Sequence, residues 1–365
     1  MQVRGCIQSH LAPLVKGYEL IQSCHYSVVC LGGVFYTIIK AINRSSMKKS
    51  ILRFLRVADI LIAPLVYPSA WLLKYVRRAG VQRLPNCKKA LMKIGVFPIL
   101  NHYYEPQFDN RKAKQPLSQD RALPGVDWNI TNQLKILEGF RFSQELADIP
   151  QKKPDTLDFY FNNGAFESGD AEYWYQLIRS IKPKRIFEVG SGNSTLMAIK
   201  AIRRNQQQDP DYRCKHVCIE PYEMSWLEET GVSVVRKKIE DVEPVFFSEL
   251  EEHDILFIDS SHIIRPQGDV LFEYLELLPT LRKGVIVHVH DIFSPKNYLK
   301  QWLEDEVKFW NEQYLLEAFL SHNCSWKIIG ALNYLHHHYY DELKFAAPFL
   351  TPDREPGSFY IQRIV

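Results

Sequence analysis

At 365 residues, the chain can form one large domain with appendages or two domains. A composition of 46% hydrophobic and 24% charged residues excludes a disordered protein. The seven cysteines are scattered and include no CxxC pair, which predicts reduced thiols in a cytosolic protein.

The net charge of +3 conceals an asymmetry along the chain. Residues 1–100 carry 15 Lys and Arg against Glu19 and Asp59, whereas the remainder carries 30 against 40 acids. The basic residues alternate with long aliphatic runs, so the predicted partner is an anionic membrane surface and not nucleic acid. We therefore expect a cytoplasmic protein that is peripheral at a membrane.

Two apolar stretches open the chain. The first, Tyr26–Ile39, is too short to span a bilayer, and we interpret residues 1–46 as an upstream extension that is not folded with the rest. Residues 47–83 form a basic, amphipathic segment whose apolar run, 60–73, contains two prolines. These prolines argue against a straight spanning helix and favour an interfacial or hairpin-like membrane anchor. A helix packed on the body of the protein and a true span remain open.

Residues 84–157 are predicted to form a loop-rich cap or lid. Its motif His102-Tyr-Tyr-Glu105 either lines a pocket or packs as a linker, and a helix is expected over 131–146. From residue 158 to 365 we predict a single domain. It begins with a helix from Asp170 to Ile181, with Asp170 as its N-cap.

Strands and helices then alternate, which predicts a parallel sheet covered on both faces. The expected strands are 185–189, 215–219, 232–237, 254–258, 285–289, 326–331 and 358–362. The expected helices are 193–205, 222–230, 240–250, 268–278, 297–314 and 332–346.

The turn after the first strand is the most informative stretch. Gly190 and Gly192 follow Glu188 and precede a helix start at Asn193 or Ser194, an arrangement that lets the backbone turn sharply and approach a ligand. An ordinary strand-to-helix turn is the simpler interpretation. A dinucleotide fingerprint needs a third glycine, but position 195 is Thr, which argues against an NAD site.

Acidic residues lie at or near four strand ends: Glu188, Glu220, Asp259 and Asp291. His262 and His290 accompany them. Each alone is most simply a cap or an ion-pair partner. Because ligands of open α/β sheets bind beyond the carboxyl ends of the strands, their repetition at one edge predicts a site.

These motifs resemble those of class I methyltransferases that use S-adenosylmethionine (SAM). The resemblance is carried by the segments 188–195, 218–221, 257–262, 287–293 and 356–360. Within the family, the chain resembles a largely bacterial subgroup that is often found with polysaccharide or natural-product genes. It extends over about residues 158–363. It implies a Rossmann-like, seven-stranded, mostly parallel sheet with helices on both faces and an antiparallel last strand, preceded by a helical and loop extension.

The resemblance also implies roles for single residues. The loop before helix 170–181 covers the cofactor in the family, so Phe166 and Ser168 become candidate SAM contacts. The residues implied to bind SAM are Glu188, Gly190, Ser191, Gly192, Glu220, Glu240, Asp241 and Asp259. Among them, the two acceptor oxygens of Glu220 suit a ribose diol. Glu240 and Asp241 stand where the family contacts adenine, although either can simply cap the next helix.

Catalysis is implied at Asp259 and His262. In metal-dependent O-methyltransferases of this fold, carboxylates at the places of Asp259 and Asp291 bind Mg²⁺ or another divalent ion. His262 stands where catechol-type enzymes have the Lys that takes the substrate proton. Ile292 departs from that pattern, so a softer metal on His262, His288 or His290 is an alternative, as is a structural pair of His288 and His290.

We therefore expect a SAM-dependent methyltransferase that acts on oxygen of a sugar, a glycan or glycolipid, or a related small hydroxylated acceptor. The alternatives are a metal-dependent hydroxylase or NAD enzyme on a similar sheet, and a non-catalytic SAM-binding scaffold. The adjacent histidines 336–338 point in different directions on a helix and predict no metal site.

Overall fold

The computed structural model describes residues 48–101, 106–107, 113–222 and 224–365. The expectations for residues 1–46 and for the 102–105 motif lie outside these residues. The chain divides into two compact units, residues 1–108 and 109–365, and each is considered by itself.

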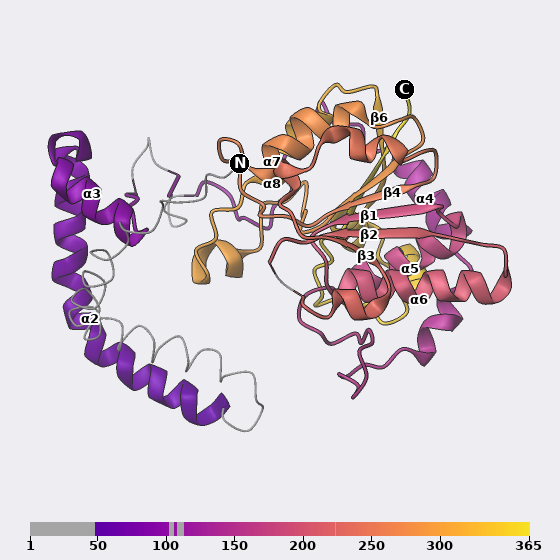
Figure 1. The fold of residues 1–365 in the computed structure, drawn as a ribbon, viewed down its shortest axis with the longest axis horizontal. Helices are drawn as coiled ribbons and strands as arrows, with labels where there is room; N and C mark the ends of the chain where they lie inside the picture. Colours follow the sequence, from indigo (N-terminus) through magenta and orange to yellow (C-terminus); the bar gives the residue numbers. More distant parts are fainter. Residues whose placement is uncertain (1–47, 102–105, 108–112, 223) are drawn as a thin grey trace, which may run out of the picture. The chain divides into compact units, whose positions relative to one another are not determined.

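The first unit is helical. It contains α2 (Lys48–Ala79), the short 3-10 helix η1 (Val81–Arg83) and α3 (Pro85–Ile94), which ends at Gly95 in the left-handed conformation. The interruption expected at Pro64 and Pro68 is absent: α2 is a continuous helix of 32 residues, and its ribbon curves along its length (Figure 1). Each proline removes one backbone hydrogen bond, and a helix of this length retains the others.

Most of the apolar side chains described in α2 are exposed, and Val76 is buried. Within the part of the chain that the structure describes, Leu55–Ala79 is the one helical stretch long and apolar enough to cross a membrane, by length and composition alone. The large exposed side chains are Val57, Ile60, Leu61, Ile62, Leu65, Val66, Tyr67, Trp71, Leu72 and Tyr75. No charged residue lies between Ile60 and Leu73, so this part of the helix is apolar on all sides.

The second unit is built on a seven-stranded sheet with the order β3-β2-β1-β4-β5-β7-β6. Its strands are β1 (Arg185–Val189), β2 (Lys215–Ile219), β3 (Ser233–Val235), β4 (Ile255–Ile258), β5 (Ile286–Val289), β6 (Trp326–Ala331) and β7 (Phe359–Arg363). The last strand, β7, runs antiparallel to both of its neighbours, β5 and β6, and the remaining pairs are parallel. The Rossmann-like sheet with an antiparallel last strand is thus confirmed.

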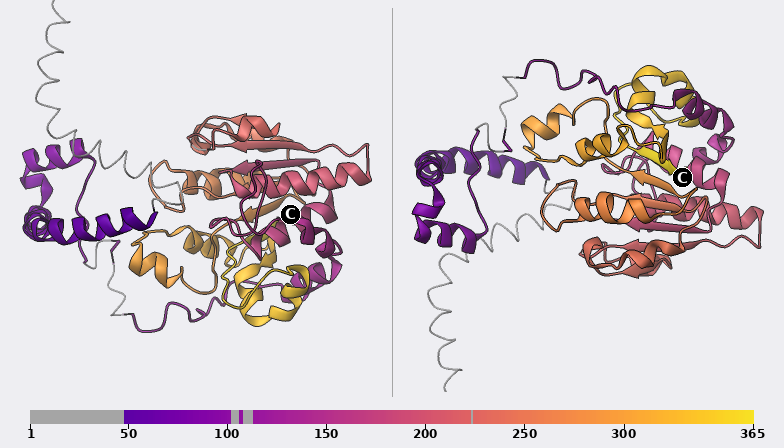
Figure 2. Two further views of the ribbon diagram at one scale, coloured as in Figure 1. Left: turned by 90° about the horizontal axis from the view of Figure 1, so that it is seen from below. Right: turned by 90° about the horizontal axis from the view of Figure 1, so that it is seen from above.

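Helices cover both faces of this sheet (Figures 1 and 2). One face packs with α4 (Ile130–Gly139), α5 (Asp170–Ile181), α6 (Asn193–Gln208), α9 (Leu332–His338) and α10 (Tyr340–Ala346). The other packs with α7 (Asp269–Leu271), the π-helix η7 (Phe272–Leu277) and α8 (Glu312–Leu320). Along β1, Ile186 faces the first layer, and Phe187 and Val189 face the second, as the alternation of side chains along a strand requires.

Several helices differ from the sequence expectations. The helix expected over 297–314 is wrong: the π-helix η9 (Gln301–Asp305) is followed by irregular chain, and α8 begins only at Glu312. The reason is tertiary, because the backbone N–H groups of Asn311 and Glu312 donate to the His262 carbonyl and hold this segment against the end of β4.

Other boundaries moved less. The expected helix 131–146 ends at Gly139 and is followed by η3 (Ser143–Asp148), whose Leu146 is fully buried in the first core layer. Leu146 therefore belongs to the core. The expected helix 222–230 is reduced to the 3-10 helix η4 (Leu227–Thr230), and the expected helix 240–250 to η5 (Ile239–Asp241) and η6 (Pro244–Glu249). The helical stretch expected over 268–278 ends with η8 (Leu278–Thr280). The helix expected over 332–346 is divided into two at Tyr339.

Candidate active site

A pocket of about 890 Å³ lies beyond the carboxyl ends of the parallel strands. One side is formed by the loops after β1, β2 and β3, and the other by the chain after β4 and β5 together with η9. The sequence-predicted residues that line it are Phe166, Gly190, Ser191, Gly192, Glu220, Glu240, Asp259, His290 and Asp291. Most of the predicted site is thus brought together at one edge of the sheet.

Gly190 is the tightest point of the site. Its φ is +77°, and a Cβ added there would lie 2.0 Å from the carbonyl oxygen of Asp259. Gly192 is less constrained, because an added Cβ meets only the Met224 methyl group at 3.7 Å. Between them, the hydroxyl of Ser191 is buried without a hydrogen-bond partner in the described residues, which suits a polar ligand in the pocket.

Glu188 does not line the pocket. Its carboxylate is fully buried and accepts hydrogen bonds from the hydroxyls of Ser194 at 2.8 Å and Thr195 at 3.1 Å, and it contacts the His216 ring. Burial acts to lower the pKa of His216, but the Glu188 carboxylate outweighs it and raises this pKa to about 10. The geometry therefore connects Glu188 to the start of α6, beneath the glycine loop.

Of the three acids assigned to the ribose and adenine, Glu220 and Glu240 line the pocket and Asp241 does not. Glu220 follows β2, is 8% exposed, and has one carboxylate oxygen fixed by the Tyr222 backbone N–H at 3.0 Å. Asp241 is exposed.

Of the two candidate SAM contacts in the loop before α5, only Phe166 lies at the pocket. Its ring centroid lies 5.1 Å from that of His290. Ser168 instead donates to Glu172 at 2.7 Å, inside the protein. The expected N-cap role of Asp170 is wrong: Gly169 is the N-cap, and Glu172 accepts its N–H, so the Asp170 carboxylate is available elsewhere.

Asp259, His262 and Asp291 meet where β4 and β5 end. The Nε2 atom of His262 lies 3.3 Å from Asp259 Oδ1 and 3.6 Å from Asp291 Oδ2. His262 and Asp291 both adopt left-handed backbone conformations, with φ of 60° and 58°, which residues adopt at a cost and which cluster at functional sites. The predicted catalytic and metal-binding residues are therefore neighbours.

His262 is held from behind by Glu312, a residue that sequence reasoning missed. Its Nδ1 lies 2.8 Å from the fully buried Glu312 carboxylate, which also accepts from the Tyr274 hydroxyl at 3.0 Å. Burial acts to lower the pKa of His262, but Asp259 and Glu312 outweigh it and raise this pKa to about 10. No motif marks Glu312, because it enters the site through the segment 306–312 that was mistaken for helix.

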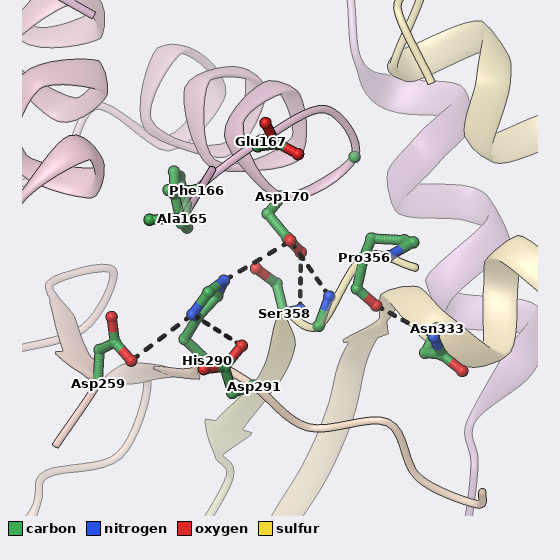
Figure 3. A network of polar contacts seen from close by, with 12 residues as sticks. Ala165, Phe166, Glu167, Asp170, Asp259, His290, Asp291, Asn333, Pro356 and Ser358 are labelled. Carbon is green, nitrogen blue, oxygen red and sulfur yellow. Dashed lines mark hydrogen bonds and ion pairs between the residues drawn. The ribbon is translucent and has the colours of Figure 1, made fainter. Parts of the chain in front are cut away.

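His288, in β5, and His290, just after β5, have different surroundings. His288 is buried in the core, with Nε2 2.8 Å from the Ser358 hydroxyl, and burial lowers its pKa well below the usual value. His290 lies at the pocket, facing Asp259 and Asp291 (Figure 3). Burial opposes protonation of His290, but these two carboxylates raise its pKa well above the usual value. The same negative field attracts any cation, whether a proton or a metal ion.

The outer wall of the pocket contains Trp302, Glu306 and Lys308, which were also missed. The Lys308 ammonium lies 4.2 Å from the Trp302 ring centroid and 4.1 Å from that of Trp310, in cation–π geometry. Trp310 in turn packs on the His262 ring at 4.2 Å. This aromatic wall lies on the side of the pocket away from the glycine loop.

The run 336–338 forms no shared site in the structure. His336 is buried, His337 lies 2.9 Å from Glu355, and His338 lies 2.7 Å from Asp120.

Comparison with known proteins agrees with this geometry. Residues 187–292 match the family model described as a methyltransferase domain. These residues therefore form part of a methyltransferase domain. A protein of Archaeoglobus fulgidus without an assigned function is 29% identical over 173 residues, which cover 44% of this chain and 76% of that protein.

Two solved structures are also similar. The methyltransferase MycE of the mycinamycin pathway, solved with Mg, S-adenosylhomocysteine (SAH) and mycinamycin VI, is 14% identical, with a TM-score of 0.30 over 53% of this chain. The match spans 48% of MycE, about half its length. A methyltransferase-like protein of Thermobifida fusca is 13% identical, with a TM-score of 0.30 over 66% of this chain and 97% of that one.

We expect Gly190→Ala to lower the free energy of unfolding by about 2–4 kcal/mol, from the left-handed backbone and the overlap with the Asp259 carbonyl. Urea unfolding measures this. Gly139→Ala is the matched control, because a Cβ there meets nothing within 4 Å, and it should cause no loss. Equal stability of the two variants would show that the close contact at Gly190 is absent.

The His216–Glu188 pair predicts a pH dependence of stability. The folded-state pKa of His216 is about 10, above the unfolded value of 6.5, so its contribution is complete below pH 6.5 and is lost as pH rises towards 10. Urea unfolding between pH 6 and pH 10 should therefore show a steeper loss for the natural chain than for His216→Gln. Parallel curves for the two proteins would contradict a charged His216.

Proposed function

We propose that this chain transfers the methyl group of SAM to an oxygen of a sugar, glycan, glycolipid or related small hydroxylated acceptor. The observation that carries the proposal is the pocket itself, which is lined by the glycine loop, Glu220, Asp259 and Asp291, with His262 within 3.6 Å of both aspartates. The oxygen specificity rests on the carboxylate and imidazole groups, because a hydroxyl needs a base, a metal or both before it attacks carbon.

The residues fit the methyl donor. SAM supplies a methyl group on a positively charged sulfonium. The Ser191 hydroxyl is a buried group with no partner in the described residues, and it faces a ligand that has polar groups at its amino-acid end. Glu220 binds the ribose hydroxyls, and Glu240 is the better candidate for the adenine amine because Asp241 lies outside the pocket.

A divalent cation, Mg²⁺ or another, fits between Asp259 and Asp291. It would supply a positive charge that orients the acceptor hydroxyl and favours its deprotonation. His262 then accepts the proton at Nε2, because its Nδ1 is bonded to Glu312. The ring has to be neutral for this role, and a cation beside Asp259 and Asp291 lowers its pKa.

The helical first unit brings this enzyme to an anionic membrane surface on the cytoplasmic side. Residues 48–101 carry 11 Lys and Arg against the single acid Asp59. Basic residues flank the uncharged stretch of α2 on both sides, and Trp71 and Tyr75 lie near its C-terminal end, as aromatic side chains do at a membrane interface.

SAM binding by the full chain, measured by calorimetry, tests the donor site. We expect one site per chain and an affinity roughly 5- to 150-fold weaker in Glu220→Ala, the cost of about 1–3 kcal/mol for polar groups left unpaired. Asp241→Ala is the control and should bind as the natural chain does. A folded chain that binds no SAM would exclude the donor role and favour the hydroxylase. Binding without transfer to any acceptor would favour the scaffold.

Flotation with lipid vesicles tests the membrane role. The natural chain should float with vesicles that contain phosphatidylglycerol. The exposed Leu65 changed to Asp (Leu65→Asp) should weaken vesicle binding roughly 100-fold, because transfer of an acidic side chain into the membrane costs about 3 kcal/mol. Leu157→Asp changes an exposed leucine of the second unit and should have no effect. Equal flotation of both variants would remove α2 as the anchor.

A further inference from the structure

We propose that His290 is the nitrogen ligand of a mixed metal site with Asp259 and Asp291, and that this site selects Mn²⁺, Fe²⁺, Co²⁺ or Zn²⁺ over Mg²⁺. The proposal deepens the proposed function, because it names the class of metal that the methyltransferase takes. It rests on three observations: the spacing of the ligand atoms, the unsatisfied nitrogens of His290, and the buried carboxylate behind its ring.

The spacing fits ligands of one ion. Nδ1 of His290 lies 3.6 Å from Asp259 Oδ1 and 3.5 Å from Asp291 Oδ1, and one ligand atom from each residue lies within 4.8 Å of the others. These distances exceed the 2.7–3.2 Å of an ordinary N–H···O bond. Ligands at about 2.1 Å from a shared ion stand roughly 3.0–3.4 Å apart, which is closer to the observed spacing.

The nitrogens of His290 are unusual for buried groups. The side chain is 5% exposed, and neither ring nitrogen makes a hydrogen bond to any described residue. A buried polar atom without a partner costs about 1–3 kcal/mol, so two on one ring require an explanation. A metal ion at Nδ1 accounts for the nitrogen that faces the two carboxylates.

The other ring nitrogen, Nε2, faces the Asp170 carboxylate. Oδ2 of Asp170 lies 3.6 Å from His290 Nε2, and the backbone N–H groups of Gly357 at 3.1 Å and Ser358 at 2.7 Å donate to the same carboxylate (Figure 3). A carboxylate behind a ligating imidazole fixes its tautomer and raises its basicity. Asp170 is therefore a positioning residue: at 3.6 Å its negative charge, and not a hydrogen bond, favours the tautomer with the proton at Nε2, which leaves the Nδ1 lone pair for the ion.

The donor set decides the class of metal. Mg²⁺ prefers oxygen ligands in a strict octahedron, whereas imidazole suits ions such as Fe²⁺ and Zn²⁺, and the affinity of a mixed nitrogen and oxygen site rises from Mn²⁺ through Fe²⁺ to Co²⁺. One nitrogen and two carboxylates make a mixed set of this second kind. His262 lies near the same carboxylates, but its Nδ1 is bonded to Glu312, and we assign it to proton transfer and not to the metal.

Binding of Mn²⁺, Co²⁺, Zn²⁺ and Mg²⁺ to the full chain, measured by calorimetry without SAM, tests the proposal. We expect Mn²⁺ and Co²⁺ to bind at least 10-fold more tightly than Mg²⁺. Electron spin echo spectroscopy of the bound Mn²⁺ should show coupling to one imidazole nitrogen. Mg²⁺ bound as tightly as Mn²⁺, or bound Mn²⁺ without nitrogen coupling, would overturn the assignment.

Variants separate His290 from its neighbours. His290→Glu should retain a metal, lose the nitrogen coupling and gain affinity for Mg²⁺ relative to Mn²⁺. Asp170→Asn should weaken Mn²⁺ binding roughly 10- to 100-fold. His337→Gln, a histidine outside the pocket, should change nothing. Unchanged Mn²⁺ affinity and nitrogen coupling in a folded His290→Glu variant would overturn the proposal.

The two proposals fail in different ways. A chain that binds SAM but no metal would contradict this inference and leave the donor site intact. A chain that binds Mn²⁺ with nitrogen coupling but no SAM would leave this inference intact and overturn the methyltransferase proposal.

Discussion

The close contact between Gly190 and the Asp259 carbonyl is the constraint on which the site depends. It joins the ends of β1 and β4, strands that already pair through Val189 and Ile258. Because no side chain fits between them, the glycine loop and the first acid of β4 share one wall of the pocket. The chain after β1 and the chain after β4 are thereby held close together by a backbone contact.

The second determinant is the concentration of negative charge in a largely buried place. Asp259, Asp291, Asp170 and Glu312 converge from four separate segments of the chain, and burying carboxylates is costly unless cations accompany them. His262 and His290 lie among them, and both have raised pKa values. A sulfonium and a divalent ion are cations too, so the field that stabilises the imidazolium rings also favours the two ligands proposed above.

Local sequence signals were sufficient for the strands and the glycine loop. The strands were placed within one or two residues because each is a short apolar run followed by polar or glycine residues. The helix expected over 297–314 does not form as one element. The Asn311 N–H donates to the His262 carbonyl, and the Ile264 N–H donates to Asn311 Oδ1, across about fifty residues that no local pattern connects. Glu188 was assigned to the cofactor because of the resemblance to class I methyltransferases, but its partner His216 lies on the neighbouring strand. Glu312, Trp302 and Lys308 were missed for the same reason as the helix: they enter the site only through tertiary contacts.

The direction of β7 explains how the motif Pro356–Tyr360 reaches the site. Parallel strands end at the pocket with their carboxyl ends, whereas an antiparallel strand begins there, and the backbone N–H groups of Gly357 and Ser358 just before it point at the Asp170 carboxylate. A side chain at Gly357 would come within 3.2 Å of the Asp291 Cα. The antiparallel last strand thus brings backbone N–H donors to the edge of the sheet where the parallel strands bring carboxylates. These donors stabilise the buried Asp170 carboxylate behind His290, which therefore needs no Lys or Arg partner.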